Sequence, residues 1–361
     1  MKAAVFVEKQ RIIVEERSKP VADPGEVVVA VSHCGICGSD IHGYLNGIVI
    51  KPGTVMGHEC TGTISQVGEG AGVWSIGDRV AVKPMAECGT CHYCCRGQLS
   101  LCTQAVAEGI GLVPGRDGAF ASHIRIRHPG KMLFRLPDEV SFEEAVFTES
   151  LATSLHGVRR SGFRPGDSAV VIGAGTIGLG VIQFLRIGGA RRIIVLEPST
   201  KKRELALKMK ADMVLDPMAE RSETRRRVYD FTWGLGADHV FECAGAPQAL
   251  QTSYGLARRG GQVMLIGVSE KEVSIKPLLL CVREVSLRGV FGYYDEFPMV
   301  IDFIQQGKID TASMLSDVIP LEQIEDRGFR RLAGNPDLVK IAVVPDNESL
   351  PQEPGFDWGG L

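Results

Sequence analysis

Side chains that bind metals and carry protons are concentrated between positions 37 and 59 of this sequence. They are Cys37, Ser39, Asp40, His42, His58 and Glu59. A thiolate, an imidazole and carboxylates are donor types that bind zinc, and a hydroxyl near a second imidazole can pass a proton. On these residues alone, two interpretations stay open: a zinc site, or a buried cysteine followed by a surface His-Glu pair.

Four further cysteines have a spacing typical of a metal-binding loop. Cys88, Cys91, Cys94 and Cys102 follow the pattern C-x2-C-x2-C-x7-C. Four thiolates complete a tetrahedron around one zinc ion and leave no open position, so we interpret this cluster as a structural zinc site. Free thiols or an iron–sulfur cluster are the alternatives. Cys95 breaks the spacing and is interpreted as a spare thiol.

A glycine-rich turn forms a third motif. An apolar strand is expected at 168–172, a helical pattern follows the turn, and a second strand at 192–196 ends at Glu197. This order is the dinucleotide fingerprint, in which the turn and the helix N-terminus approach a pyrophosphate and the acid binds the ribose hydroxyls. The candidate cofactor-binding residues of the turn are Gly173, Gly175, Thr176, Ile177 and Gly178. The alternative is a doubly wound domain that binds no nucleotide.

The charge of Glu197 favours NAD over NADP, because a carboxylate repels a 2′-phosphate. Lys201, Lys202 and Arg203 lie close behind it in the chain and can hold a phosphate, so NADP stays as the alternative, with Lys202 as a candidate cofactor contact.

Two kinds of secondary structure must position these groups. Short β-branched runs before residue 150 predict a β-barrel-like domain, and alternating strands and helices from about residue 167 predict a doubly wound parallel sheet. The expected strands are 26–31, 62–67 and 78–82 in the first part and 168–172, 192–196, 238–242, 262–266 and 285–290 in the second. Gly267 closes a turn and is a candidate cofactor contact. The predicted fold class is α/β.

Length and composition restrict the class of protein. A chain of 361 residues predicts two domains. A formal charge of −3 argues against a nucleic-acid partner, and the sequence has no apolar run long enough for a membrane span. Ten cysteines without a secretion signal predict a cytoplasmic, reducing location. Residues 346–361 are expected to form a mobile tail.

The three motifs, in this order, resemble the zinc-dependent medium-chain dehydrogenase/reductase family up to about residue 345. The segments Cys37–His42 and Gly57–Glu59 are similar to the catalytic-zinc segments of the sorbitol (polyol) and butanediol dehydrogenase branch. The segment Thr148–Leu151 resembles a third one, in which that branch has Glu-Pro-Leu and this chain has Ser150. The sequence Arg-Glu-Val-x-x-x-Gly-Val-Phe also matches the polyol dehydrogenases, starting at Arg283.

The resemblance implies a GroES-like catalytic domain over 1–150 and 291–345 and a Rossmann NAD-binding domain over 151–290. It also implies two zinc ions per subunit. The catalytic zinc is expected on Cys37, His58 and Glu149, with Glu59 either a direct ligand or a group that exchanges with water. Ser39 and His42 are expected to relay the proton, and Thr153 to contact the nicotinamide.

Arg283 and Glu284 are expected at a polyhydroxylated substrate, and the alternative is that they cap a strand or form a subunit contact. The implied reaction is oxidation of a secondary alcohol or polyol to a ketone, with hydride transfer to NAD. Butanediol, threonine and cyclitol dehydrogenases of the same family are alternatives, and so is a non-catalytic zinc- and NAD-binding regulator. A homo-oligomer, tetramer or dimer, is expected.

Overall fold

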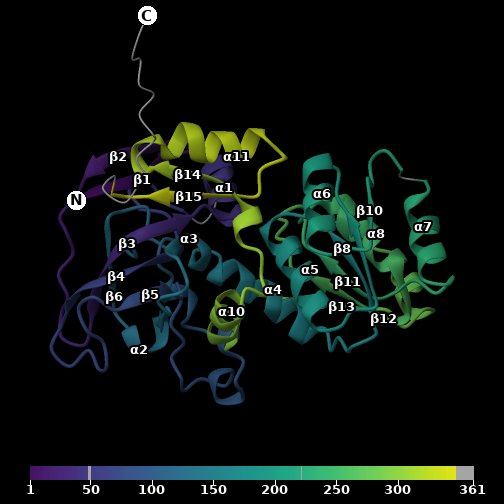
Figure 1. The fold of residues 1–361 in the computed structure, drawn as a ribbon, viewed down its shortest axis with the longest axis horizontal. Helices are drawn as coiled ribbons and strands as arrows, with labels where there is room; N and C mark the ends of the chain where they lie inside the picture. Colours follow the sequence, from purple (N-terminus) through teal and green to yellow (C-terminus); the bar gives the residue numbers. More distant parts are fainter. Residues whose placement is uncertain (48–49, 221, 347–361) are drawn as a thin grey trace, which may run out of the picture.

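The computed structural model describes residues 1–47, 50–220 and 222–346. Two sheets lie side by side in the same molecule, and α4 and α10 lie between them (Figure 1). The predicted tail over 346–361 falls outside the described residues, except for Asp346. Within the described ranges no helix is long and apolar enough to cross a membrane.

The first sheet, here called the mixed sheet, has the strand order β14-β15-β3-β4-β5-β7, and β6 also pairs with β3. Its strands are β3 (Val27–Gly35), β4 (Glu59–Val67), β5 (Arg79–Val82), β6 (His123–Ile126), β7 (Leu133–Arg135), β14 (Leu315–Pro320) and β15 (Lys340–Val344). A separate antiparallel pair consists of β1 (Lys2–Glu8) and β2 (Arg11–Glu16). Val27, Val28 and Val29 of β3 are buried, and they suit this arrangement because β-branched side chains pack well on a buried sheet face.

The register of the mixed sheet assembles the segments of the first motif. Antiparallel pairing of β3 with β4 sets Cys34 opposite Cys60 and Gly35 opposite Glu59. Pairing of β15 with β3 then sets Ala342 opposite Gly35. The start of β15, a strand from the end of the described chain, therefore lies at the same end of β3 as the start of β4, on the other side of that strand.

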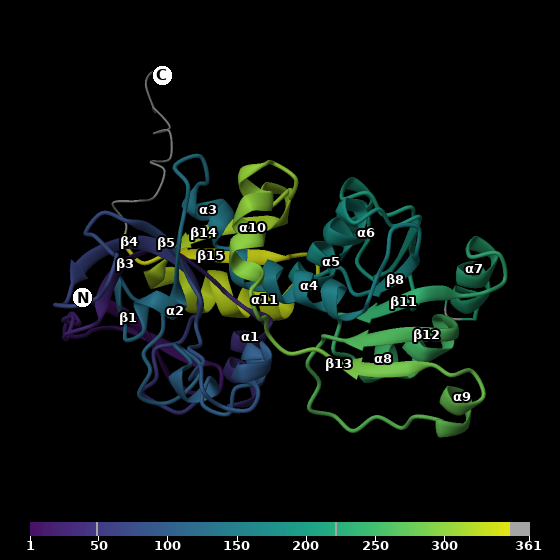
Figure 2. The same cartoon turned by 90° about the horizontal axis from the view of Figure 1, so that it is seen from below.

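The second sheet, here called the parallel sheet, has the order β10-β9-β8-β11-β12-β13. Figure 2 shows β8, β11, β12 and β13 side by side. Its strands are β8 (Ser168–Ile172), β9 (Arg192–Leu196), β10 (Met213–Leu215), β11 (Ala237–Glu242), β12 (Ala257–Leu265) and β13 (Ser286–Gly289). The order reverses at β8, which lies between β9 and β11, and ligands of such sheets bind at this switch point. The glycine-rich turn comes directly after β8.

The helices are α1 (Gly38–Asn46), α2 (Pro129–Met132), α3 (Phe142–Ala145), α4 (Thr148–Arg160), α5 (Thr176–Ile187), α6 (Thr200–Lys208), α7 (Thr224–Phe231), α8 (Pro247–Leu256), α9 (Pro277–Cys281), α10 (Glu296–Gln305) and α11 (Arg331–Gly334). Short 3₁₀ or π segments are η1 (Cys94–Arg96), η2 (Leu99–Leu101), η3 (Val106–Glu108), η4 (Ala312–Met314), η5 (Leu321–Gln323) and η6 (Ile324–Arg330). One hydrophobic cluster joins Leu151 of α4 to Val171 of the parallel sheet and Ala342 of the mixed sheet. The two sheets are thus packed against a shared helix.

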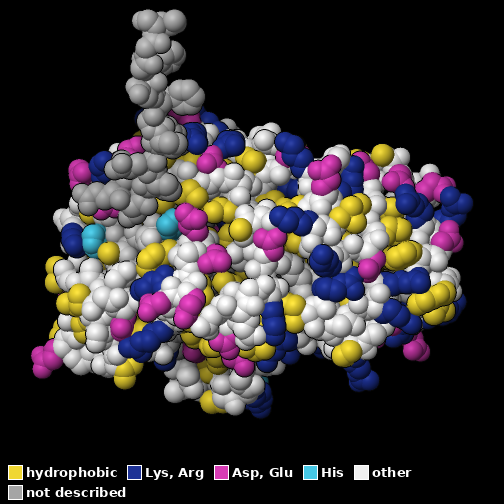
Figure 3. Space-filling view, viewed as in Figure 1, with side chains coloured by type: hydrophobic (Ala, Val, Ile, Leu, Met, Phe, Trp, Pro, Cys, Tyr) yellow, Lys and Arg dark blue, Asp and Glu magenta, His cyan; other side chains and the backbone are white. Residues whose placement is uncertain are grey.

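The predicted α/β class, with a β-barrel-like part and a doubly wound parallel sheet, is confirmed. The strands at 168–172 and 192–196 have the predicted bounds, and the strand expected at 26–31 extends to Gly35. On the face shown in Figure 3, basic and acidic side chains are interspersed.

Candidate active site

Three of the predicted metal ligands meet where α1 and β4 begin. One ligand atom each from Cys37, His58 and Glu59 lies within 4.8 Å of the others. Cys37 is the N-cap of α1, and Glu59 is the first residue of β4, so the junction of a loop and a strand aligns the donors. His58 is 4% exposed and Glu59 is fully buried.

Asp40 fixes the orientation of this cluster. Its Oδ2 accepts the backbone N–H of Cys37 at 2.9 Å, and its Oδ1 lies 3.4 Å from His58 Nδ1. Burial lowers the pKa of His58, but Asp40 and Cys37 outweigh burial and leave that pKa well above its ordinary value. A carboxylate on one ring nitrogen leaves the other available, as is usual for metal-binding histidines.

A buried ion pair joins Glu59 to Lys340, the first residue of β15. Lys340 is 2% exposed, and its ammonium group also donates to Ile36 O at 3.3 Å. Burial lowers the pKa of Lys340, but Glu59, Cys37 and Glu149 together outweigh burial and raise it. The pair occupies Glu59 Oε2, whereas Oε1 is buried and has no hydrogen-bond partner among the described residues.

This donor set fits zinc. A thiolate, an imidazole and a carboxylate oxygen form a three-ligand site of the catalytic kind, in which a fourth position stays open. The unpartnered buried oxygen of Glu59 supports this assignment, because a buried carboxylate oxygen without a partner is costly unless a cation binds it. The structure therefore groups Glu59, rather than Glu149, with Cys37 and His58.

Glu149 lies next to this group, in the first turn of α4. Burial raises the pKa of Glu149 to about 7, with His58 opposing and Glu59 adding to the shift. The hydroxyl of Tyr293 is buried, and its pKa is raised by burial and by the nearby Glu149. Glu149 and Tyr293 thus flank the ligand group from the side of α4 and α10.

The predicted proton-carrying residues lie on α1, which starts at the cluster. Ser39 Oγ is 3.5 Å from His58 Nε2. His42 is exposed and lies one helical turn after Ser39, so the two side chains share a face of α1. Thr153 is half-buried on α4, and its Oγ1 donates to Glu149 O at 3.5 Å.

The predicted structural zinc ligands come together in a separate loop. Sulfur atoms of Cys88, Cys91, Cys94 and Cys102 all lie within 4.8 Å of one another. Backbone N–H groups of Thr90 and Cys91 donate to Cys88 Sγ and lower the pKa of that thiol to about 6. Amides directed at a sulfur favour the thiolate, so this loop fits a tetrathiolate zinc site.

The glycines of the fingerprint have three different roles. Gly173 has a φ of +92°, which a side chain would strain. Gly175 is the N-cap of α5, and a Cβ there would meet open space. A Cβ on Gly178 would lie 1.9 Å from Gly173 O, so helix and strand could not pack as closely. These are the tight turn, close approach and helix packing that a pyrophosphate site needs.

The turn touches both the acid after β9 and the mixed sheet. Glu197 is 7% exposed and accepts backbone N–H groups of Ala174 at 2.7 Å and Ser199 at 2.9 Å. Thr176 Oγ1 donates to Val339 O at 3.3 Å, next to Lys340. Ile177 is half-buried in the first turn of α5.

The two remaining candidate cofactor contacts, Lys202 and Gly267, lie on different segments of the parallel-sheet half. Lys202 is half-buried beside Glu197: burial lowers its pKa and the carboxylate opposes the shift. Gly267 lies just after β12, and a Cβ there would lie 2.2 Å from Gly245 N, so only glycine permits this turn.

Arg283 and Glu284 are not brought to the ligand group. The guanidinium of Arg283 donates to Tyr254 O at 3.1 Å, Ala257 O at 2.5 Å and the hydroxyl of Tyr229 at 2.6 Å. Glu284 is exposed, with a φ of +51°. Arg283 thus braces α7, α8 and β12 through hydrogen bonds within the parallel-sheet half of the molecule, which favours the alternative of a structural role over a contact with the substrate.

Sequence reasoning missed Lys340 and Tyr293. Lys340 opens a strand whose other members are all apolar, and it is as buried as they are. A single lysine in such a strand indicates a buried partner charge, so the signal was present. Tyr293 precedes α10 by a few residues and carries no local pattern that distinguishes it from a core tyrosine.

Comparisons with known proteins match both halves of the chain. Residues 23–138 match the family "Alcohol dehydrogenase GroES-like domain", and residues 176–306 match "Zinc-binding dehydrogenase". Sorbitol dehydrogenase of Bacillus subtilis is 33% identical, over 96% of this chain and 98% of the relative. The crystal structure of 2R,3R-butanediol dehydrogenase from Bacillus subtilis has a TM-score of 0.87 at 32% identity, over 96% of this chain and 99% of that one. A zinc-binding dehydrogenase structure from Sinorhizobium meliloti bound to NADP has a TM-score of 0.86 at 30% identity, covering 95% and 99%.

The chain therefore belongs to the zinc-dependent medium-chain dehydrogenase/reductase family, in the branch of the sorbitol and butanediol dehydrogenases. This confirms the predicted class, a zinc-containing enzyme that acts on alcohols or polyols with a nicotinamide cofactor.

Proposed function

We propose that this enzyme oxidises a secondary hydroxyl of a polyol or vicinal diol to a ketone and transfers the hydride to NAD. One observation carries the proposal. The ligand group of Cys37, His58 and Glu59 and the dinucleotide turn are joined by two consecutive residues, since Val339 accepts a hydrogen bond from Thr176 and Lys340 pairs with Glu59. The ligand group and the dinucleotide turn thus both contact the segment Val339–Lys340.

Cys37, His58 and Glu59 are proposed to hold the catalytic zinc, with Glu149 beside it. When bound, zinc supplies Lewis-acid polarisation of the substrate hydroxyl, and the nicotinamide accepts the hydride. Asp40 holds the imidazole of His58 in place, and Lys340 holds the carboxylate of Glu59. The thiolates of Cys88, Cys91, Cys94 and Cys102 are proposed to hold a second, structural zinc.

The proton leaves along α1. Ser39 Oγ lies beside the ligand group and accepts the proton of the substrate hydroxyl. His42 is one helical turn further on and exposed, so its ring can take up the proton and release it to water.

NAD rather than NADP is proposed as the cofactor. Glu197 is nearly buried at the end of β9, where the ribose of the adenosine binds in this fold. The relative from Sinorhizobium meliloti holds NADP, so NADP stays as the alternative. Lys201 and Lys202 are the residues of this chain that would receive a 2′-phosphate.

A homo-oligomer formed through the edge of the parallel sheet is also proposed. β13 is an edge strand, and it is mostly exposed. Next to it in the chain, Leu278 and Val282 are 71% and 55% exposed. The outer edge of β13 has no neighbouring strand among the described residues, and such an edge beside exposed apolar side chains favours pairing with a second copy. A cytoplasmic location is proposed because the free cysteines suit a reducing compartment.

The test is NAD reduction with a panel of alcohols, run on the wild type and on Cys37→Ser. The panel contains sorbitol, xylitol, galactitol, the 2,3-butanediol isomers, threonine, an inositol and 2-propanol. We expect activity on one polyol or diol, and a loss of about a thousandfold or more in Cys37→Ser, because the thiolate ligand is gone. Activity that survives in Cys37→Ser would contradict the proposed site, and activity only on threonine or an inositol would assign the alternative substrate class.

A further inference from the structure

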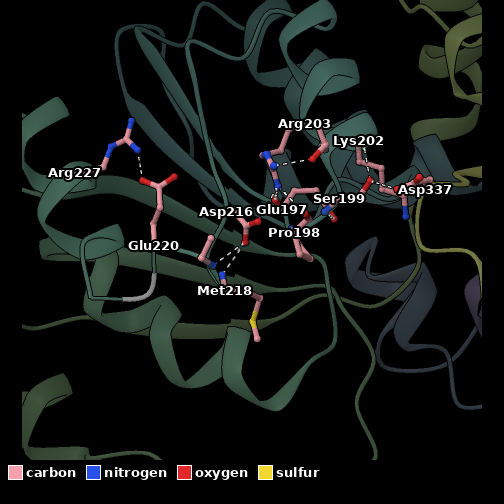
Figure 4. A network of polar contacts seen from close by, with 12 residues as sticks. Glu197, Pro198, Ser199, Lys202, Arg203, Asp216, Met218, Glu220, Arg227 and Asp337 are labelled. Carbon is pink, nitrogen blue, oxygen red and sulfur yellow. Dashed lines mark hydrogen bonds and ion pairs between the residues drawn. The ribbon is translucent and has the colours of Figure 1, made fainter.

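A carboxylate from the mixed-sheet half of the molecule reaches the adenosine end of the cofactor site. Asp337 lies between α11 and β15, and its Oδ1 accepts a hydrogen bond from Ser199 Oγ at 2.7 Å (Figure 4). Ser199 is the N-cap of α6, and its backbone N–H donates to Glu197. Ser199 therefore links Asp337 to Glu197, the acid proposed to bind the adenosine ribose.

Two lysines face these two carboxylates. Lys201 Nζ lies 3.6 Å from Asp337 Oδ2. Lys202 is half-buried, and both Glu197 and Asp337 act on its ammonium group. The third cation of the run is occupied: Arg203 donates to Glu197 O at 2.8 Å and Pro198 O at 2.6 Å, and lies 3.3 Å from Asp216. The charge balance at this end of the site thus depends on Asp337.

The residues that come after Asp337 in the chain hold it in position. Val339 accepts the hydroxyl of Thr176 from the glycine-rich turn, and Lys340 is held by buried Glu59 at the ligand group. The segment from Asp337 to Lys340 thus contacts the ribose end, the pyrophosphate turn and the metal ligands in succession. This anchoring fixes the backbone next to Asp337, and the hydrogen bond from Ser199 orients its carboxylate.

We propose that Asp337 is a specificity-determining residue that excludes a 2′-phosphate, and therefore NADP, by neutralising Lys201 and Lys202 and by adding a second negative charge beside Glu197. The inference rests on the proposed use of NAD and deepens it. Selectivity at the adenosine ribose is then contributed partly by the mixed-sheet half of the molecule.

The physical reason is that two lysines close to the adenosine ribose would otherwise attract a phosphate dianion. With Asp337 and Glu197 present, two carboxylates offset the two ammonium groups. Removing one carboxylate near a dianion changes its binding by roughly tenfold at the partly solvated distances of such a site. The 2′-hydroxyl of NAD carries no charge, so its binding changes much less.

The experiment measures binding of ADP-ribose and of 2′-phospho-ADP-ribose to the full-length protein by calorimetry, together with NAD and NADP reduction. Asp337→Asn keeps the shape of the side chain and an oxygen that can accept from Ser199, so folding is preserved. We expect the affinity ratio of the phosphorylated to the unphosphorylated ligand to rise about tenfold. Glu204→Gln is the matched control, because it removes an equal charge from an exposed position on α6.

A ratio that changes by less than about twofold in Asp337→Asn, or equally in Glu204→Gln, overturns the inference. Failure of the wild type to bind either ligand overturns it together with the cofactor assignment. Binding with the expected ratios but no oxidation of any alcohol supports the inference and contradicts only the proposed reaction. Asp337→Ala is the second variant: we expect it to raise the ratio at least as far, since it also releases Ser199.

Discussion

The two cysteine-containing clusters of this protein are built in opposite ways. The ligands Cys88, Cys91, Cys94 and Cys102 come from one loop, and three of the four thiols are half-exposed. The group of Cys37, His58 and Glu59 needs α1 and β4 for its ligands and β15 for the partner of Glu59. The loop can form from local sequence, whereas the second group exists only once distant strands have paired.

The charges of the ligands are also stabilised locally in one cluster and by distant residues in the other. Backbone amides lower the pKa of Cys88, so part of the loop's thiolate charge is stabilised locally. In the other group, charge is balanced by Asp40 against His58 and by Lys340 against Glu59, with Glu149 beside them. A closed tetrathiolate has no room for a substrate, while a three-ligand group does. The comparison separates a cluster that supports structure from one that can do chemistry.

The largest effect on stability is expected from breaking the buried ion pair. Glu59→Gln removes a ligand and leaves the Lys340 ammonium group buried without its partner, so activity should fall at least a hundredfold and the free energy of unfolding by about 3 kcal/mol. Adding Lys340→Met should recover at least half of the lost stability but none of the activity. Chemical denaturation and NAD reduction measure the two quantities.

The control for this cycle is the ion pair of Arg327 and Asp317 at the surface. Loss of Arg327 leaves no unpaired charge, because Arg331 also pairs with Asp317. Arg327→Met should change stability far less than Glu59→Gln does. If Lys340→Met recovers nothing in the Glu59→Gln background, the pair is not coupled as the structure indicates. Zinc in the cysteine loop should stay bound in every variant of the cycle.

A smaller effect is expected from the proton route, because water can partly replace an exposed histidine. His42→Ala should lower kcat about tenfold, and added imidazole should restore part of it. His92→Ala is the matched control, since His92 is an exposed histidine in the cysteine loop whose ring contacts Arg96. Equal losses in the two variants, or no rescue by imidazole, would show that His42 carries no proton.

The sequence predicted the parts of this molecule that are encoded locally. Alternating strands and helices, the glycine turn and the four-cysteine loop each depend on residues close in the chain, and the fold class could be inferred from them. Long-range partners were harder to predict. Lys340 lies far along the chain from Glu59, and only the pairing of β15 with β3 reveals their contact.

The surroundings of Arg283 could not be predicted for a related reason. Its family pattern was recognised, but the pattern does not say which groups the guanidinium contacts, and these include the hydroxyl of Tyr229, which is distant in the chain. Glu59 and Glu149 were both recognised as carboxylates near the metal. That Glu59 belongs to the ligand group and Glu149 only flanks it could be seen only from the register of β3 with β4.

The most direct test of the two-cluster division is X-ray absorption at the zinc edge on Cys37→Ser and Cys91→Ser, each compared with the wild type. We expect about two zinc ions per chain in the wild type and about one in each variant. In Cys37→Ser the remaining zinc should have only sulfur neighbours, at about 2.3 Å, whereas in Cys91→Ser nitrogen and oxygen neighbours at about 2.0–2.1 Å should dominate. The same mixture of neighbours in both variants would contradict the division into a structural and a catalytic cluster.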